Sequence, residues 1–153
     1  MKKDLYVGES KISGKGLFAN KAFKRGQVVF LLKGDIKNLK IRNSKDSALG
    51  PNWVGVKTGV WIDPDGAGKY INHSCNPNAG IMGKVKFVAL RDIKKGEEIT
   101  YDYSISEDDD FWFFKCKCNT KKCRKIIRSV QYLPEPVFRS YLPYIPNHFQ
   151  KVY

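Results

Sequence analysis

Residues 69–78 read KYINHSCNPN, and this stretch is the most informative part of the chain. It places Asn72, His73 and Cys75 close together, a combination that would suit a nucleophilic cysteine beside a histidine. Adjacent side chains on a short segment point in different directions, however, and the only other histidine is His148. A thiol protease is therefore a poor fit. The plainer interpretation is that Asn72 is a buried polar side chain that hydrogen-bonds a loop.

The four cysteines favour a metal site. Cys75 stands alone, whereas Cys116, Cys118 and Cys123 form a C-x-C-x4-C cluster. Tetrahedral Zn2+ takes four thiolates at about 2.3 Å, so three clustered cysteines and one distant cysteine match a structural site. The surrounding lysines favour the thiolate form. Two disulfides would need an oxidising compartment, for which the sequence has no signal, and four idle thiols would not need this clustering.

The chain has the size and composition of one globular domain. Its 153 residues are 42% hydrophobic, and no run approaches the ~20 apolar residues of a membrane-spanning helix. Residues 1–15 have a charged start with no apolar stretch behind it, so no classical secretory signal is expected. We expect an intracellular protein, cytoplasmic or nuclear, without membrane contact. The net charge of +13 favours nucleic-acid contact, with a solvated basic surface as the alternative.

Short β-rich runs alternate with turn signals and predict a mostly β fold with few short helices. Helical pattern is limited to residues 44–49 and to a segment after Cys123. From residue 133 the chain combines four prolines with aromatic residues, and we expect this apolar tail to pack on the domain, either irregular or broken into short turns. The predicted strands cover residues 17–19, 28–32, 53–56, 60–62, 85–89 and 98–101.

Four segments, in order along the chain, resemble the SET-domain protein lysine methyltransferases. Residues 13–19 (SGKGLFA) are similar to the first cofactor motif of that family, and residues 69–78 to its Asn-His-Ser-Cys-x-Pro-Asn signature. Residues 96–103 (GEEITYDY) are similar to its catalytic strand and turn, and residues 116–123 to its post-SET zinc motif, in which Cys75 supplies the fourth ligand. The resemblance implies a SET fold of small curved sheets, with a knot-like threaded C-terminal segment and a post-SET zinc site.

The resemblance also implies transfer of a methyl group from S-adenosylmethionine to a lysine amine, with Zn2+ as a structural ion. Tyr103 matches the catalytic tyrosine. Tyr101 occupies a position that resembles a product switch, and its hydroxyl favours mono- or dimethylation. Lys69 stands where the family usually has arginine, so it keeps the charge but loses the bidentate fork. The residues implied to bind the cofactor are Gly14, Lys15, Gly16, Leu17, Lys69, Asn72, His73, Ile126 and Ile127.

The acidic cluster at residues 107–110 lies between Tyr103 and Cys116, and the implied fold places it near the peptide entrance. An ordinary solvated loop is the alternative. The expected organisation is a SET catalytic domain over residues 1–110, a post-SET zinc motif over 111–130 and an aromatic, proline-rich extension over 131–153. A basic protein or peptide such as a histone would then be steered by Glu107, Asp108, Asp109 and Asp110.

Two other functions are compatible with the sequence. A catalytically inactive SET module would bind peptide without transferring a methyl group, although Asn72, His73, Tyr103 and the cysteines all match the active family. A basic zinc module would bind nucleic acid with steep salt dependence and without any need for the cofactor. The oligomeric state is not predicted.

Overall fold

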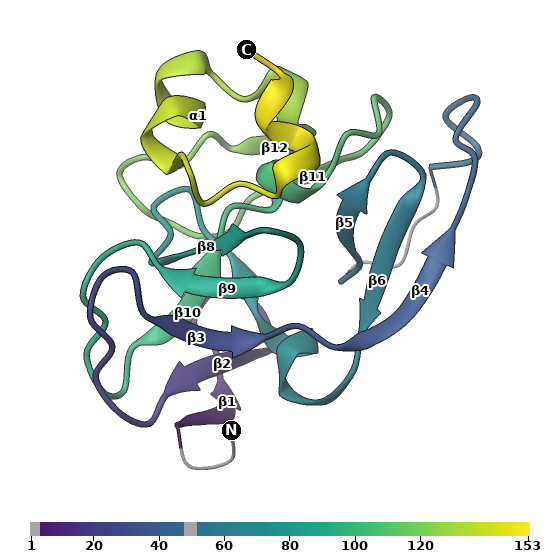
Figure 1. Cartoon of the computed structure of the whole chain (residues 1–153). Helices are drawn as coiled ribbons and strands as arrows, with labels where there is room; N and C mark the ends of the chain where they lie inside the picture. Colours follow the sequence, from purple (N-terminus) through teal and green to yellow (C-terminus); the bar gives the residue numbers. More distant parts are fainter. Residues whose placement is uncertain (1–3, 48–51) are drawn as a thin grey trace.

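The computed structural model describes residues 4–47 and 52–153 and shows a mostly β chain with one α-helix among these residues (Figure 1). The predicted fold class is confirmed. The strands are β1 (Leu5–Glu9), β2 (Lys15–Ala19), β3 (Val28–Leu31), β4 (Gly34–Asn38), β5 (Val54–Lys57), β6 (Val60–Pro64), β7 (Asn72–His73), β8 (Ala79–Met82), β9 (Lys86–Ala89), β10 (Glu98–Tyr101), β11 (Phe113–Lys115) and β12 (Ile126–Arg128). The helical segments are α1 (Glu135–Tyr141) and the 3-10 segments η1 (Gly66–Tyr70), η2 (Tyr103–Ser106), η3 (Val130–Tyr132) and η4 (Asn147–Lys151).

The strands form small sheets that lie around one another. The four-stranded sheet has the order β1-β2-β10-β7, two three-stranded sheets have the orders β3-β9-β8 and β4-β6-β5, and β11 pairs with β12. Among the described strands, every pairing is antiparallel except that of β10 with β7. Figure 1 shows the β4-β6-β5 sheet to one side of the β3-β9-β8 sheet, with α1 and the C-terminal segment on the side away from the N-terminus.

The parallel pair is the crossing that brings the two central sequence motifs together. β7 runs beside the end of β10, although the two strands are separated by the whole of β8 and β9. Asn78 fixes this crossing because its side chain donates to the Glu98 carbonyl at 2.8 Å and accepts from the Thr100 N–H at 2.9 Å. The Asn78 side chain is buried, so water does not compete for these bonds.

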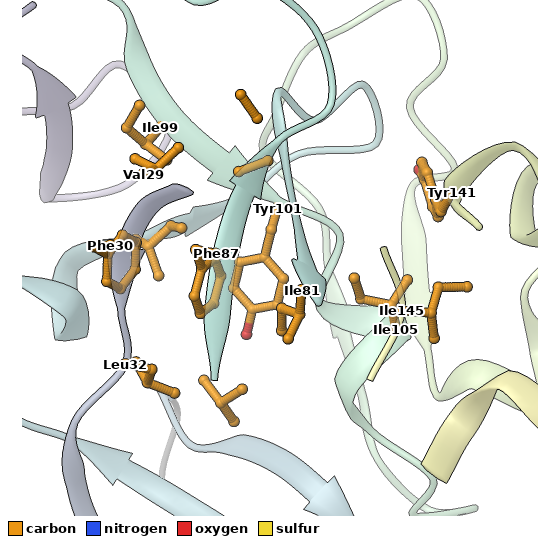
Figure 2. Packing of buried hydrophobic residues seen from close by; sticks show 14 of the residues in the cluster. Val29, Phe30, Leu32, Ile81, Phe87, Ile99, Tyr101, Ile105, Tyr141 and Ile145 are labelled. Carbon is orange, nitrogen blue, oxygen red and sulfur yellow. The ribbon is translucent and has the colours of Figure 1, made fainter. Parts of the chain in front are cut away.

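One hydrophobic core joins the sheets and holds β10 from inside. The Phe30 and Phe87 rings stack with centroids 4.5 Å apart, and Phe87 meets the edge of Tyr101 at 5.1 Å. Figure 2 shows Tyr101 beside Phe87 and Ile81, with Ile105 and Ile145 on the far side of this cluster. Residues from the middle and the end of the sequence therefore share the same core.

The tail after residue 133 packs along β8. The Ile81 N–H donates to the Tyr144 carbonyl at 2.9 Å, and the Asn147 N–H donates to the Gly83 carbonyl at 3.0 Å. A Cβ atom at Gly80 would lie 2.8 Å from the Tyr144 carbonyl oxygen, so this approach requires glycine. The buried side chains of the tail include Phe138, Tyr141, Ile145 and Phe149.

The predicted strands agree with the structure better than the predicted helices do. All six appear, as β2, β3, β5, β6, β9 and β10, with ends that differ by at most two residues. Residues 44–47 form a turn rather than a helix, and residues 48 and 49 lie outside the described residues. After Cys123 the chain first forms β12, and the helix is α1. The tail is broken into short helical segments, as one of the two expectations for it has it, and α1 accommodates Pro136 because this residue falls in the first helical turn, where proline costs no hydrogen bond.

None of the helices in the part of the chain described by the structure is long and apolar enough to cross a membrane.

Candidate functional site

A cleft of about 440 Å³ opens beside β7 and the turn that follows β10. Its size is typical of pockets for small molecules, which span roughly 300–1,000 Å³. The loop before β2, the β7 segment, η2 and β11 all contribute to its walls. Three residues singled out from the sequence, Asn72, His73 and Tyr103, meet in this cleft, where they are joined by Ser13, Phe113 and Phe114.

Tyr103 is the first residue of η2, and hydrogen bonds fix both its backbone and its side chain. Its hydroxyl donates to the Ile71 carbonyl at 2.7 Å, and its N–H donates to Nδ1 of His73 at 3.0 Å. Its ring lies 5.4 Å from the His73 ring and 5.7 Å from the Phe114 ring, measured between centroids. Burial raises the pKa of the Tyr103 hydroxyl above its ordinary value, so the group stays protonated and acts as a donor.

His73 acts as a neutral connecting group. Burial lowers its pKa to about 4, and the nearby Arg124 guanidinium lowers it further against the effect of Asp102. Because Nδ1 accepts from Tyr103, the proton of the neutral ring belongs on Nε2, which lies 3.3 Å from Cys75 Sγ. The imidazole therefore links the Tyr103 turn to a cysteine of the cluster.

Tyr101 lies behind the cleft rather than in its wall. Its side chain is buried against Phe87 and Tyr103, and its hydroxyl is 3.4 Å from Oγ of Ser106. Burial raises the pKa of this hydroxyl as well. The role predicted for Tyr101 in limiting methylation stays a prediction.

Asn72 connects the first glycine-rich loop to β10. Its side-chain nitrogen lies 3.2 Å from the Ser13 carbonyl, 3.0 Å from the Lys15 carbonyl and 2.7 Å from Oε1 of Glu98. The Ser10 hydroxyl also donates to the Glu98 carboxylate, at 2.8 Å. Sequence reasoning missed Glu98, although it stands inside the GEEITYDY motif.

The other residues predicted to bind the cofactor lie outside the cleft wall. Gly14 adopts a positive φ of 48°, Gly16 packs under the Glu98 carboxylate, and Leu17 is fully buried. The ammonium groups of Lys15 and Lys69 lie 5.9 and 5.2 Å from the centre of the Tyr70 ring. In this loop the cleft is lined instead by Ile12 and Ser13.

The structure also places Ile126 and Ile127 away from the cleft. Alternation along β12 points Ile127 into a small core with Cys75 and Cys118, while the Ile126 side chain faces outward and is 45% exposed. The aromatic wall comes from the partner strand, through Phe113 and Phe114, and from Trp112 before it. The run FWFF at residues 111–114 was the sequence signal for this wall.

The four cysteine sulfurs form a compact cluster. They all lie within 4.8 Å of one another, and the Cys75 and Cys116 sulfurs are 3.8 Å apart. Four ligands at about 2.3 Å from a tetrahedral Zn2+ are about 3.8 Å apart, so the arrangement fits this ion. The Arg124 N–H lies 3.3 Å from Cys75 Sγ and the Cys118 N–H 3.4 Å from Cys116 Sγ. Burial raises the pKa of the Cys75 thiol to about 11, so four thiolates this close require a cation.

A buried carboxylate, that of Asp102, joins the cysteine cluster to the Tyr103 turn. It has no exposed surface, and Arg124 donates to both of its oxygens, at 2.7 and 2.8 Å. The Tyr141 hydroxyl donates to the same carboxylate at 2.9 Å. Sequence reasoning missed all three residues. Asp102 and Arg124 adjoin recognised motif residues, but nothing in the sequence signals the contact with α1.

The acidic segment is mostly turned inward. Glu107 and Asp109 are buried, whereas Asp108 is half-buried and Asp110 is exposed. The Glu107 carboxylate accepts from the Trp61 indole N–H at 2.9 Å and from two backbone N–H groups. The segment borders a second groove, of about 590 Å³, whose other side is formed by residues 39–41 and the β5-β6 turn.

Comparisons with known proteins agree on one family. The SET domain profile matches residues 14–104. The chain is 30% identical over 139 residues to histone-lysine N-methyltransferase 2D of Homo sapiens, covering 81% of this chain and 2% of that protein. It is 32% identical to the H3 lysine-4 specific histone-lysine N-methyltransferase of Schizosaccharomyces pombe, covering 80% of this chain and 15% of that protein. The chain thus spans a small part of these relatives.

Solved structures support the same fold. The crystal structure of KRYPTONITE in complex with mCHH DNA, an H3(1-15) peptide and SAH aligns with a TM-score of 0.64 at 21% identity, over 81% of this chain and 29% of that chain. The ctPRC2 structure in an autoinhibited conformation, bound to S-adenosylmethionine, aligns with a TM-score of 0.55 at 24% identity, over 68% of this chain and 15% of that chain.

The zinc site predicts a metal stoichiometry. Purified protein should contain one Zn2+ per chain by mass spectrometry, and Cys118→Ser should lose it because three thiolates hold the ion less well than four. Thr120→Ser, beside the cluster, keeps all four ligands and should keep the zinc. A Cys118→Ser protein that retains one zinc per chain would contradict the site.

Glu107 predicts a pH dependence of stability. Burial raises its pKa from 4.5 to about 7, against the hydrogen bonds it accepts from Asp109 and Trp61. Between these values the native state binds the proton more tightly than the unfolded chain, so the free energy of unfolding falls as pH rises, by up to about 3 kcal/mol in total. Urea unfolding at pH 4.5 and 7.5 should show a smaller fall for Glu107→Gln. The exposed Glu135→Gln should match wild type, and the same fall in all three proteins would contradict the assignment.

Proposed function

Because the chain belongs to the SET-domain family, we propose that it transfers a methyl group from S-adenosylmethionine to a lysine side-chain amine of a basic protein. Histones are the substrate class that we favour. The observation that carries the proposal is the cleft in which the Tyr103 hydroxyl, Asn72 and His73 meet an aromatic wall. In the reaction the lysine nitrogen forms a bond to the methyl carbon as the carbon–sulfur bond breaks, and the amine proton leaves to solvent.

The residues in the cleft fit the cofactor. Asn72 and the His73 backbone would hold its amino-acid and adenine parts, and Phe114 and Trp112 would cover the ring. We retain Gly14 and Gly16 as the residues whose small size would allow the Ser13 backbone to approach the cofactor. S-adenosylmethionine supplies an activated methyl group on a positively charged sulfonium.

The residues of the cleft would align the lysine amine with the methyl group and shield the amine from water. Tyr103, fixed by its bonds to Ile71 and His73, presents its hydroxyl where an amine and a methyl group would meet, and alignment alone supplies a large part of such a rate. A lysine amine has an ordinary pKa of about 10.4, and an apolar surrounding lowers it by disfavouring the charged form. The Phe114 ring, which lies beside Tyr103 in the wall of the cleft, would provide that surrounding.

We propose that the substrate enters the site beside the acidic segment of residues 107–110. We place the entrance beside Asp108 and Asp110, whose carboxylates are not buried, and we assign Glu107 and Asp109 to holding the segment in place. The hydroxyl of Tyr101, near Ser106, supports mono- or dimethylation. The proposal keeps the division into residues 1–110, 111–130 and 131–153, and a cytoplasmic or nuclear location, where thiolates stay available for zinc.

Tyr103→Phe tests the reaction. Tritiated S-adenosylmethionine incubated with core histones should label lysines, and Tyr103→Phe should lower the rate at least about a hundredfold because an aligned hydroxyl is lost. Tyr6→Phe removes the hydroxyl of an exposed tyrosine of β1 that does not line the cleft, and it should keep full activity. Equal rates for wild type and Tyr103→Phe would contradict the role of Tyr103. Cofactor and peptide binding without any label would favour the inactive peptide-binding module.

Nucleic acid is a second partner that a specific observation favours. Residues 111–128 contain no acidic residue, and five of their lysines are exposed without a carboxylate within 4.0 Å in the described part of the chain. Such a surface suits the phosphate backbone of DNA or RNA. The five are Lys115, Lys117, Lys121, Lys122 and Lys125.

Salt dependence tests this contact. For a labelled 30-base-pair DNA, changing Lys121, Lys122 and Lys125 to Gln should reduce the slope of log affinity against log salt by about 2 to 3, roughly 0.9 per lost phosphate contact. The matched triple change of Lys57, Lys84 and Lys86 alters the net charge equally on other elements. Equal slopes for the two triple variants would mean that the affinity for DNA depends on net charge alone, and this would contradict a specific contact by the lysines of residues 111–128.

A further inference from the structure

Resting on the proposed function, we propose that Tyr141 of α1 is a positioning residue for methyl transfer. Its hydroxyl fixes the Asp102 carboxylate, and the carboxylate fixes the turn that carries Tyr103. The C-terminal extension is then part of the catalytic apparatus rather than an appendage to it.

The Asp102 carboxylate is the point where three segments meet. Its Oδ2 accepts from Arg124 at 2.7 Å and from the Tyr141 hydroxyl at 2.9 Å, and its Oδ1 accepts from Arg124 at 2.8 Å. Asp102 has no exposed surface, and Tyr141 is 7% exposed. A carboxylate this deeply buried is held in one orientation by these donors, because it has no contact with solvent in the native structure.

The carboxylate acts on Tyr103 through the backbone. Asp102 is the N-cap of η2, and its Oδ1 accepts from the Ser104 N–H at 3.1 Å. A rotation of the Asp102 side chain would therefore release the first turn of η2, whose first residue is Tyr103. That release would also strain the bond from the Tyr103 N–H to His73 and shift the hydroxyl that reaches the Ile71 carbonyl.

The position of Tyr141 is itself well fixed. α1 is followed by the segment that pairs with β8 through Tyr144, and Ile145 is buried in the main core, as Figure 2 shows beside Ile105. Tyr141 also borders a cavity of about 300 Å³ with Cys75 and Arg124. This space gives water a route to Asp102 once the hydroxyl is gone, so the carboxylate would gain a mobile partner in place of a fixed one.

The test compares two tyrosines of the same extension. Tyr141→Phe removes the bond to Asp102, whereas Tyr153→Phe removes a bond of 2.7 Å to the Leu133 carbonyl and does not touch the turn. We expect Tyr141→Phe to lower kcat about tenfold, the effect of losing one hydrogen bond to a buried charge, with KM for cofactor and peptide nearly unchanged. Both variants should keep one zinc per chain and full cofactor stoichiometry.

Amide hydrogen exchange gives a readout that does not depend on activity. Tyr141→Phe should speed exchange at Tyr103 and Ser104 relative to the amides of β9, and Tyr153→Phe should not. If wild type transfers no methyl group but Tyr141→Phe still frees these amides, Tyr141 does fix the turn that carries Tyr103, and it is the proposed function that fails. Unchanged exchange and kcat in Tyr141→Phe would overturn the proposal. So would equal changes in both variants, or a kcat loss matched by lost cofactor stoichiometry.

Discussion

The buried Asp102 carboxylate is the constraint on which the rest of the structure depends. It has no contact with solvent, so its charge is stabilised largely by the hydrogen bonds that Arg124 and Tyr141 donate to it. These partners come from the cysteine segment and from α1, which are remote from Asp102 in sequence. Leaving such a charge without its partner typically costs about 3–5 kcal/mol, a large share of the stability of a small domain. The native fold is therefore stable only when the Asp102 turn, the cysteine segment and α1 lie together.

The hydrogen bonds around Asp102 continue into a closed circuit. Arg124 donates from its backbone to Cys75, the His73 ring lies against the same sulfur, and the Tyr103 N–H donates to the other side of that ring. Metal binding at the cysteines and the orientation of Tyr103 are consequently parts of one arrangement. The apolar core around the cysteines is small, with Ile127 at its centre, so a metal bound at this point would stabilise a segment that has little packing of its own.

The sequence predicts the parts of this circuit that lie within short motifs. Asn72, His73 and Tyr103 were identified because the two segments that carry them resemble motifs of the SET-domain family, and alternation and turn residues located six strands. The role of Tyr141 could not be predicted from the sequence. Its hydrogen-bond partner Asp102 is 39 positions away, and a tyrosine among prolines forms no distinctive pattern. Ile126 and Ile127 were predicted to bind the cofactor, whereas in the structure Phe113 and Phe114 of the paired strand β11 line the cleft, and the sequence does not reveal which of two adjacent apolar runs faces it.

Some charged residues of this molecule hold the fold together from inside, whereas others lie at the surface. The acidic segment looks from sequence like one surface patch, yet Glu107 holds Trp61 and two backbone N–H groups, and Asp109 is buried beside it. Because Glu107 and Asp109 are buried, Asp108 and Asp110 are the two carboxylates of this segment that reach the surface. The lysines of residues 111–128 have no such internal use. A chain of net charge +13 therefore has both negative and positive groups at its surface in this region, the carboxylates of Asp108 and Asp110 and the exposed lysines of residues 111–128.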